Sequence, residues 1–273
     1  MASCENRITR RAFLSAAAGG SVAATTPAFA QGAAPNWPDR LVRIIVPYPA
    51  GGSTDVLSRI IAERLKDKLG QSFVIENRPG AGGNIGIDAV AKAEPDGYTV
   101  GAATVGHFSI NQYLYARMSW DPDRDLQPVS MTWELPNVAV VPTQHVPAKT
   151  LAEFIAWAKA RDGGILFGSP GMGTTPHLSG ALLGVRSGYK ATHVPFRGAA
   201  ATIPAMLSGD IHFAIDNLAS YVSIIESGQM RALAVTSPTR WPTMPNVPTM
   251  AEAGMPNFVV SVCGSESNAT PDR

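Results

Sequence analysis

The stretch Arg43–Asp55, RIIVPYPAGGSTD, decides how the rest of the chain can fold. Its first four residues are mostly β-branched or apolar and predict a buried strand. Gly51 and Gly52 then allow a tight turn, and the Ser and Thr after them are residue types that begin helices. Apolar residues recur at helical spacing as far as Gly70, which predicts a helix. The free N–H groups at such a helix N-terminus suit a small anion, although an ordinary, well-capped strand–helix loop explains the same residues.

The composition is that of a protein with a proper hydrophobic core. The chain has 273 residues, of which 45% are hydrophobic and 16% are charged, enough for one large or two medium domains. A net charge of +1 gives no argument for a nucleic-acid partner. No cluster of cysteines and histidines has the spacing of a zinc site.

The first thirty residues have the features of a cleaved export signal. A basic start contains the pair Arg10 and Arg11, a small apolar run extends from Ala12 to Ala24, and Ala28–Ala30 fits a cleavage site. The segment TRRAFL is similar to a twin-arginine signal, and an ordinary secretory signal with two arginines is the alternative. Either route places the mature protein outside the bacterial cytoplasm, with Cys263 as its one cysteine.

Strands and helices alternate along the rest of the chain in two series. Strands are expected at residues 43–46, 73–77 and 98–104, and then at 138–141, 165–169, 191–196, 211–215 and 232–236. This pattern predicts an α/β fold with helix-covered parallel sheets. We expect two lobes, residues 31–134 with 238–273 and residues 135–237, joined by crossings near 135–142 and 231–237. Three glycine turns follow strand ends, which favours a ligand held between the lobes.

The motifs of common enzyme classes are missing from the sequence. It contains no phosphate-loop lysine motif, no dinucleotide fingerprint and no nucleophile elbow. Three polar residues stay open to two interpretations each. His177 is either a neutral hydrogen-bond donor to a ligand or a structural cap, and Arg197 either pairs with a carboxylate or is a surface arginine. Asp216, with Asn217 after it, either binds polar groups or caps the next helix.

Several motifs together resemble one family of transport proteins. They are RIIVPYPAGGSTDVLSR, VIENRPGAGGNIG, PDGYT, FGSPGMGTTPHLSG, THVPFRG, SGDIHFAIDN and RALAVTSPTRWPTMPNVPTMAEAGMPNF, between about Arg40 and Phe258. They look like the solute-binding receptors of tripartite tricarboxylate transporters, the Bug family. The resemblance implies a periplasmic, two-lobed Venus-flytrap receptor of type II that is monomeric, has no cofactor and no catalytic activity, and hands a small carboxylate to a membrane permease.

The resemblance also implies a set of ligand-binding residues. Carried over by position, these are Tyr48, Ala50, Gly51, Gly52, Ser53, Thr54, Asp55, Asn84, Thr104, His107, Ser169, Gly173, Thr174, His177, Arg197 and Asp216. Two other functions compete with the transport receptor. One is a periplasmic hydrolase that uses Ser53 or Ser169, and the other is a ligand-sensing co-receptor on the same fold.

The end of the chain departs from the family pattern. After Phe258 a family member would continue with a strand and then with helices that complete the first lobe, whereas this chain continues as VVSVCGSESNATPDR. We expect this polar tail to be a truncated or altered end that cannot replace the strand and the helices. The sheet of the first lobe should then have an unpaired edge and an uncovered apolar face, which favour aggregation.

Overall fold

The computed structural model describes residues 37–270, so the expected export signal lies outside the described residues. The strands are β1 (Val42–Val46), β2 (Phe73–Asn77), β3 (Thr99–Thr104), β4 (Leu126–Pro142), β5 (Ile165–Ser169), β6 (Ala191–Pro195), β7 (Phe213–Asn217), β8 (Met230–Val235) and β9 (Ser261–Ala269). The helices are α2 (Ser53–Leu69), α3 (Asn84–Ala91), α4 (Asn111–Leu114), α5 (Pro122–Asp125), α6 (Leu151–Lys159), α7 (Thr175–Ser187), α8 (Ala199–Leu207) and α9 (Val222–Glu226), with the short helical turns η1 (Ala81–Gly83), η2 (Gly106–Ile110) and η3 (Leu218–Ser220).

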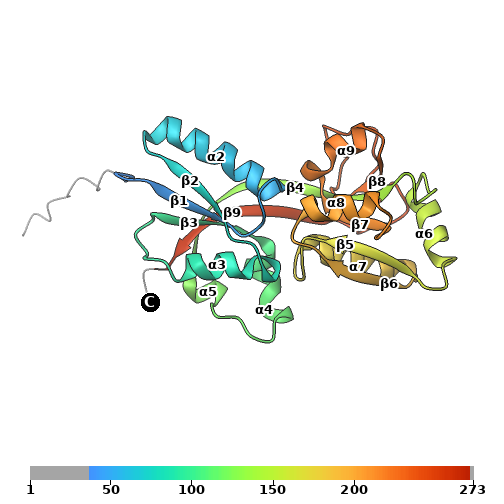
Figure 1. Ribbon diagram of the computed structural model, residues 1–273, viewed down its shortest axis with the longest axis horizontal. Coiled ribbons are helices and arrows are strands. Elements are labelled where there is room, and N and C mark those ends of the chain that lie inside the picture. Colours follow the sequence, from blue (N-terminus) through green and yellow to red (C-terminus); the bar gives the residue numbers. More distant parts are fainter. Residues whose placement is uncertain (1–36, 271–273) are drawn as a thin grey trace, which may run out of the picture. The chain divides into compact units, whose positions relative to one another are not determined.

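The first lobe is built on β1, which lies between β2 and β3 and runs parallel to both (Figure 1). Alternate side chains of a strand point to opposite faces, and β1 follows this rule. Ile44 packs with Ala62 of α2, whereas Ile45 packs with Ile87 and Val90 of α3. The sheet is therefore covered by one helix on each face, as the sequence predicts for a parallel sheet.

The long strand β4 belongs to both lobes. Its first part, Leu126–Pro136, pairs with β9, and its second part, Asn137–Pro142, pairs with β7 and β8. The sequence predicts only the second part, because the run of Asp and Pro near residues 120–128 is typical of a break rather than a strand. The partner change falls close to the expected lobe boundary at residue 135.

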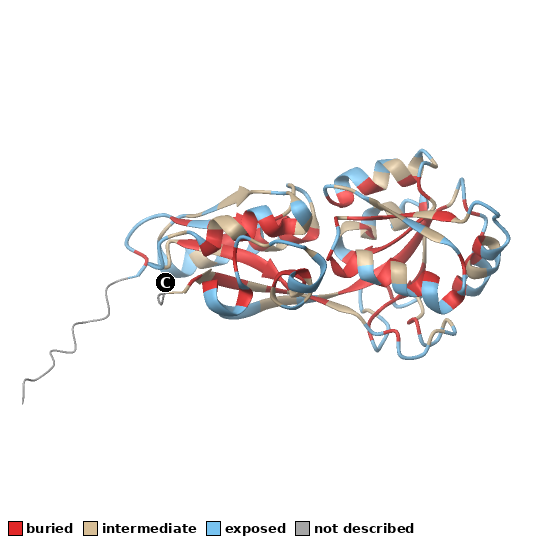
Figure 2. Cartoon of the chain, turned by 90° about the horizontal axis from the view of Figure 1, so that it is seen from below, coloured by how far each residue is buried: buried red, intermediate tan, exposed pale blue. Residues whose placement is uncertain are grey.

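The second lobe repeats the plan of the first. Strand β5 lies between β6 and β7 and runs parallel to both, and β4 adds antiparallel to β7. On one face Phe154 of α6 stacks on Phe213 of β7, and on the other Met206 of α8 packs with Ala214. Figure 2 shows the strands of the interior as buried and the outer faces of the helices as exposed.

The segment after β8 corrects the expected limits of the lobes. The core of the second lobe includes Met244, Met250 and Phe258. Residues 241–258 therefore belong to the second lobe, whereas the sequence analysis assigned them to the first. The chain re-enters the first lobe only at β9, where Ser261 pairs with Pro136. Among the helices within residues 37–270, none has both the length and the apolar character that crossing a membrane requires.

The expectation of an unpaired sheet edge is wrong. Residues 261–269 form β9, which pairs antiparallel with β3 on one side and with β4 on the other (Figure 1). Backbone pairing does not need apolar side chains, so a polar segment can fill a central position in a sheet. Its polar residues are buried as a result: Glu266 is only 7% exposed, and neither of its carboxylate oxygens has a hydrogen-bond partner among the described residues.

We expect Glu266 to make the stability depend on pH. Burial raises the pKa of its carboxyl from 4.5 to about 7, so the folded protein holds a proton that the unfolded chain releases at lower pH. The free energy of unfolding should therefore fall as the pH rises from about 4.5 to about 7. In urea denaturation at pH 5 and pH 8, Glu266→Gln should make this fall smaller by about 1–3 kcal/mol.

The matched control for this prediction is Glu134→Gln, which removes an exposed carboxyl from the neighbouring strand β4. This variant should show the same fall as the wild type. An equal fall in wild type and Glu266→Gln would mean that Glu266 is ionised in the folded protein.

Candidate functional site

A pocket lies where the carboxyl ends of strands from both lobes meet. From the first lobe it is lined by Tyr48, Pro49, Ala50, Gly52, Ser53, Thr54, Thr104, Val105, Gly106 and Val262, and from the second by Pro170, Thr174, Thr175, Pro176, Gly198, Ala199, Ala200, Asp216, Asn217 and Ser220. Most of these residues follow β1, β3, β5, β6 or β7 directly. This position is the one in which open α/β sheets bind their ligands.

Three helices begin at this pocket. The first residues of α2, α7 and α8, or the residues just before them, are all part of the lining. The first N–H groups of a helix have no partner within the helix, and the helix dipole adds about half a positive charge at that end. The pocket thus combines unpaired donors with positive potential, although it has no lysine, arginine or histidine among its lining residues.

Two of these helix ends lack a side-chain cap. Gly52 precedes α2 and Gly198 precedes α8, and neither helix has a capping hydrogen bond from a side chain. At α7, in contrast, the hydroxyl of Thr174 accepts from the N–H of His177 at 3.4 Å. The glycine-capped ends of α2 and α8 therefore keep their N–H groups available to a bound anion.

The conformation before each of these ends requires glycine at one position. Gly51 has φ +83° and Gly198 has φ +125°, conformations that residues with a Cβ rarely adopt. Gly52 has φ −79°, which any residue can adopt, so the backbone conformation does not require glycine there. Because Gly52 lines the pocket, a side chain at this position would take up space beside the first turn of α2. A Cβ on Gly198 would also lie 3.4 Å from Cδ of Pro49 across the pocket.

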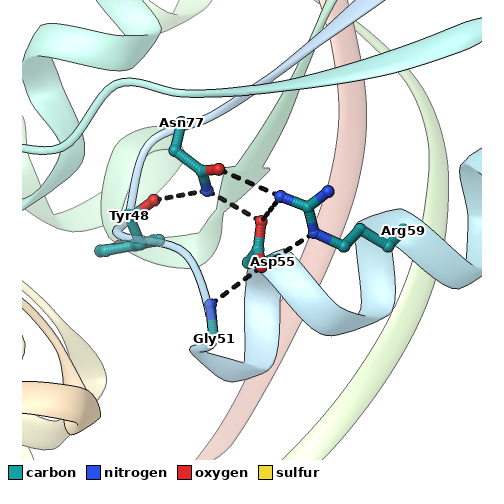
Figure 3. A network of polar contacts seen from close by, with 5 residues as sticks. All are labelled: Tyr48, Gly51, Asp55, Arg59 and Asn77. Carbon is teal, nitrogen blue, oxygen red and sulfur yellow. Dashed lines mark hydrogen bonds and ion pairs between the residues drawn. The ribbon is translucent and has the colours of Figure 1, made fainter.

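The turn before α2 is held by a buried carboxylate. Asp55 accepts from the N–H of Gly51 at 2.9 Å, from Nδ2 of Asn77 at 2.9 Å and from Arg59 at 3.0 Å (Figure 3). The same Nδ2 of Asn77 donates to the carbonyl of Tyr48 at 3.0 Å. Burial raises the pKa of Asp55, but the hydrogen bonds from Arg59, Gly51 and Asn77 outweigh it and hold the pKa below its usual value. Asp55 therefore supports the turn as a carboxylate.

One ionisable acid lines the pocket. Asp216, at the end of β7, is 1% exposed and accepts from the N–H of Asn217 at 2.7 Å and from the hydroxyl of Tyr221 at 3.1 Å. Burial raises its pKa to about 7, against the effect of those two hydrogen bonds. Tyr48 lines the pocket as well, and burial raises its pKa to about 12, so it stays a neutral phenol.

The two lobes touch beside the pocket. The hydroxyls of Ser53 and Ser220 are 2.6 Å apart, and the hydroxyl of Tyr115 donates to the carbonyl of Met172 at 3.1 Å. Gly82 comes so close to the carbonyl of Met172 that a Cβ could not fit there. These contacts join residues of the first lobe to residues of the second at one side of the pocket.

The structure divides the residues expected to bind ligand into two groups. The lining contains Tyr48, Ala50, Gly52, Ser53, Thr54, Thr104, Thr174 and Asp216. Outside the lining are Gly51, Asp55, Asn84, His107, Ser169, Gly173, His177 and Arg197. We propose the first group as the residues that contact the ligand.

Several residues outside the lining support the loops around it. Nδ1 of His107 accepts from the N–H of Thr104 at 3.0 Å, and burial lowers the pKa of this imidazole to about 4, so it is neutral. The hydroxyl of Ser169 is fully buried, lies 2.7 Å from Nε2 of His193 and donates to the carbonyl of Gly171. The ring of His177 packs on His193, with 4.2 Å between centroids.

The segment Gly198–Ala200 is the part of the lining that sequence analysis missed most clearly. It follows a strand and begins a helix, as Gly52 does, but it has one glycine instead of a glycine-rich turn. The signal that identifies it is a strand–glycine–helix junction without a capping Ser, Thr, Asp or Asn. Ser220 was also missed, although it lies three residues after Asn217, which the sequence analysis considers together with Asp216.

A family model for the tripartite tricarboxylate transporter family receptor matches residues 57–265. The chain is 38% identical to Protein BugT of Bordetella pertussis (strain Tohama I) over 229 residues, which are 84% of this chain and 70% of that protein. Among solved structures, R. palustris Rpa4515 with adipate is 38% identical with a TM-score of 0.83, over 87% of this chain and 79% of that one. MatC (Rpa3494) from Rhodopseudomonas palustris with bound malate is 30% identical with a TM-score of 0.80, over 86% and 80% of the two chains.

We expect the Asp55 network to stabilise both the fold and the pocket. Asp55→Ala would leave three donors, on Gly51, Arg59 and Asn77, without this acceptor. The free energy of unfolding should fall by about 1.5–3 kcal/mol, the range for hydrogen bonds to a charged group. Urea denaturation measures the change, and the matched control is Asp67→Ala, an exposed position on the same helix. Equal stability of the two variants would show that the network does not hold the turn.

Proposed function

Because the chain belongs to the family of tripartite tricarboxylate transporter receptors, we propose that it captures a small organic carboxylate between its two lobes and delivers it to the membrane permease of such a transporter. The family consists of solute-binding receptors, so the chain is a binding protein and not an enzyme. The hydrolase alternative is set aside on this ground. Its two candidate serines also have structural partners, since Ser53 bonds to Ser220 and Ser169 is fully buried.

The observation that carries the proposal is the pair of glycine-capped helix ends, α2 and α8, at a pocket without basic side chains. A carboxylate is small, planar and negative, and it can accept from several N–H groups at once. Backbone donors of this kind are fixed in place by the two helices, so the ligand does not have to order a long cationic side chain.

The bound ligands of related structures support a dicarboxylate. R. palustris Rpa4515 was solved with adipate and MatC with malate, and both are linear acids with two carboxyl groups. In this chain the pocket lining includes polar side chains from both lobes, among them Thr104, Asn217 and Asp216, which can bond to the second carboxyl group of a linear acid.

We place this receptor in the periplasm as a monomer. Support comes from the export signal expected at residues 1–30 and from the periplasmic role implied by its family. The twin-arginine signal, with an ordinary secretory signal as its alternative, stays a prediction from the sequence.

We predict that one added negative charge weakens capture. Ala200 is exposed, lines the pocket and lies in the first turn of α8, where an aspartate is compatible with the helix. Ala200→Asp should lower the affinity for adipate, malate and succinate by at least about fivefold, because like charges a few ångströms apart repel by about 1–4 kcal/mol. The matched control is Ala200→Asn, because asparagine has nearly the same size as aspartate but carries no charge. Titration calorimetry measures both.

Equal losses in the aspartate and asparagine variants would point to steric blocking and contradict an anion site. Delivery is tested with the same pair in cells that produce the receptor and its permease. Uptake of radiolabelled acid should fall with Ala200→Asp and persist with Ala200→Asn, and uptake that does not depend on the receptor would contradict delivery.

A further inference from the structure

Asp216 is an unusual group to find in a pocket for anions. It is the one aspartate, glutamate, lysine, arginine or histidine among the lining residues, and it is 1% exposed. A carboxylate here would share the positive helix ends with the carboxylate of the ligand. Two negative charges in one small pocket disfavour each other, so one of them tends to take a proton.

The elements packed around Asp216 bring no positive side chain to it. On its own strand and the following turn, the N–H of Asn217 and the hydroxyl of Tyr221 donate to it. From the first lobe, Tyr48 faces it, and the charge of Asp216 contributes to the raised pKa of that phenol. In β4 the residue opposite is Val138, which is apolar.

The remaining neighbours keep their charged groups elsewhere. Helix α7 packs against β7 and carries two basic residues. The ring of His177 packs on His193, and the guanidinium of Arg186 donates to the carbonyls of Pro256 and Asn257. Strand β5, on the other side of β7, pairs through Phe167 and Gly168. Asp216 is therefore held by neutral hydrogen-bond donors alone.

We propose that Asp216 takes up one proton from solvent when the acid binds, and then donates that hydrogen to an oxygen of the acid. This rests on the proposed function, since it concerns the same pocket. The doubly ionised acid, the ionised Asp216 and one proton combine into a complex with two negative charges instead of three, and the three helix ends face this smaller charge. The receptor therefore captures the dianion of a dicarboxylic acid together with a proton.

The free protein is poised for this uptake. Burial raises the pKa of Asp216 to about 7, so the carboxyl is largely ionised above neutral pH before the acid arrives. Affinity for an ionised acid should be constant well below that pH, where Asp216 is already neutral. Above that pH the affinity should fall by up to about tenfold per pH unit, because binding then takes up a proton and the proton concentration falls tenfold per unit.

The test is titration calorimetry with adipate, malate and succinate between pH 6.5 and pH 9, a range in which both carboxyl groups of these acids are largely ionised. Each titration is run in two buffers with different enthalpies of ionisation, which gives the number of protons taken up. At pH 8.5 the wild type should take up nearly one proton per acid bound. Asp216→Asn can still donate a hydrogen bond but cannot ionise, so it should take up none, and its affinity should not change with pH.

Asp210→Asn is the matched control, because it removes an exposed carboxyl from the same lobe. It should behave as the wild type. Binding by the wild type without proton uptake and without pH dependence would overturn the inference and leave the proposed function standing. Absence of binding by all three acids across the pH range would overturn both. If Asp216→Asn does not fold, the proton count of the wild type alone decides.

Discussion

In a pocket without lysine, arginine or histidine, the positive charge that an anion meets comes from the backbone, and the fold of this protein supplies it at helix N-termini. Parallel strands bring the N-termini of α2, α7 and α8 to one place, because every helix that follows such a strand begins at the same edge of the sheet. The charge that the ligand meets is the sum of three helix ends. It is fixed by topology and not by any one side chain.

This arrangement depends on features that lie outside the pocket. Asp55 holds the turn before α2 through the N–H of Gly51 and the side chain of Asn77 (Figure 3). The long strand β4 belongs to the sheets of both lobes. It therefore connects the lobe that carries α2 to the lobe that carries α7 and α8. Glycine at positions 52 and 198 leaves the donors of α2 and α8 without a competing side chain.

The sequence predicts the local part of this design well. The stretch Arg43–Asp55 contains a strand, a turn and a helix start, and the structure confirms all three. It does not show that Asp55 turns back to Gly51, because its partner Asn77 lies on the next strand and hydrogen bonds between distant residues leave no local pattern. The polar strand β9 and the early part of β4 were missed for a similar reason: each is stabilised by the other through backbone pairing, without alternating apolar residues.

The most direct measurement is a crystal structure of the receptor with adipate, malate or succinate bound, at a resolution that places the carboxylate oxygens. We predict that one carboxylate lies within about 2.7–3.2 Å of backbone nitrogens in the first turns of α2 and α8. A carboxylate that pairs instead with the guanidinium of Arg59 or Arg197 would contradict the account, because the ligand would then be held by a side-chain charge and not by the helix ends.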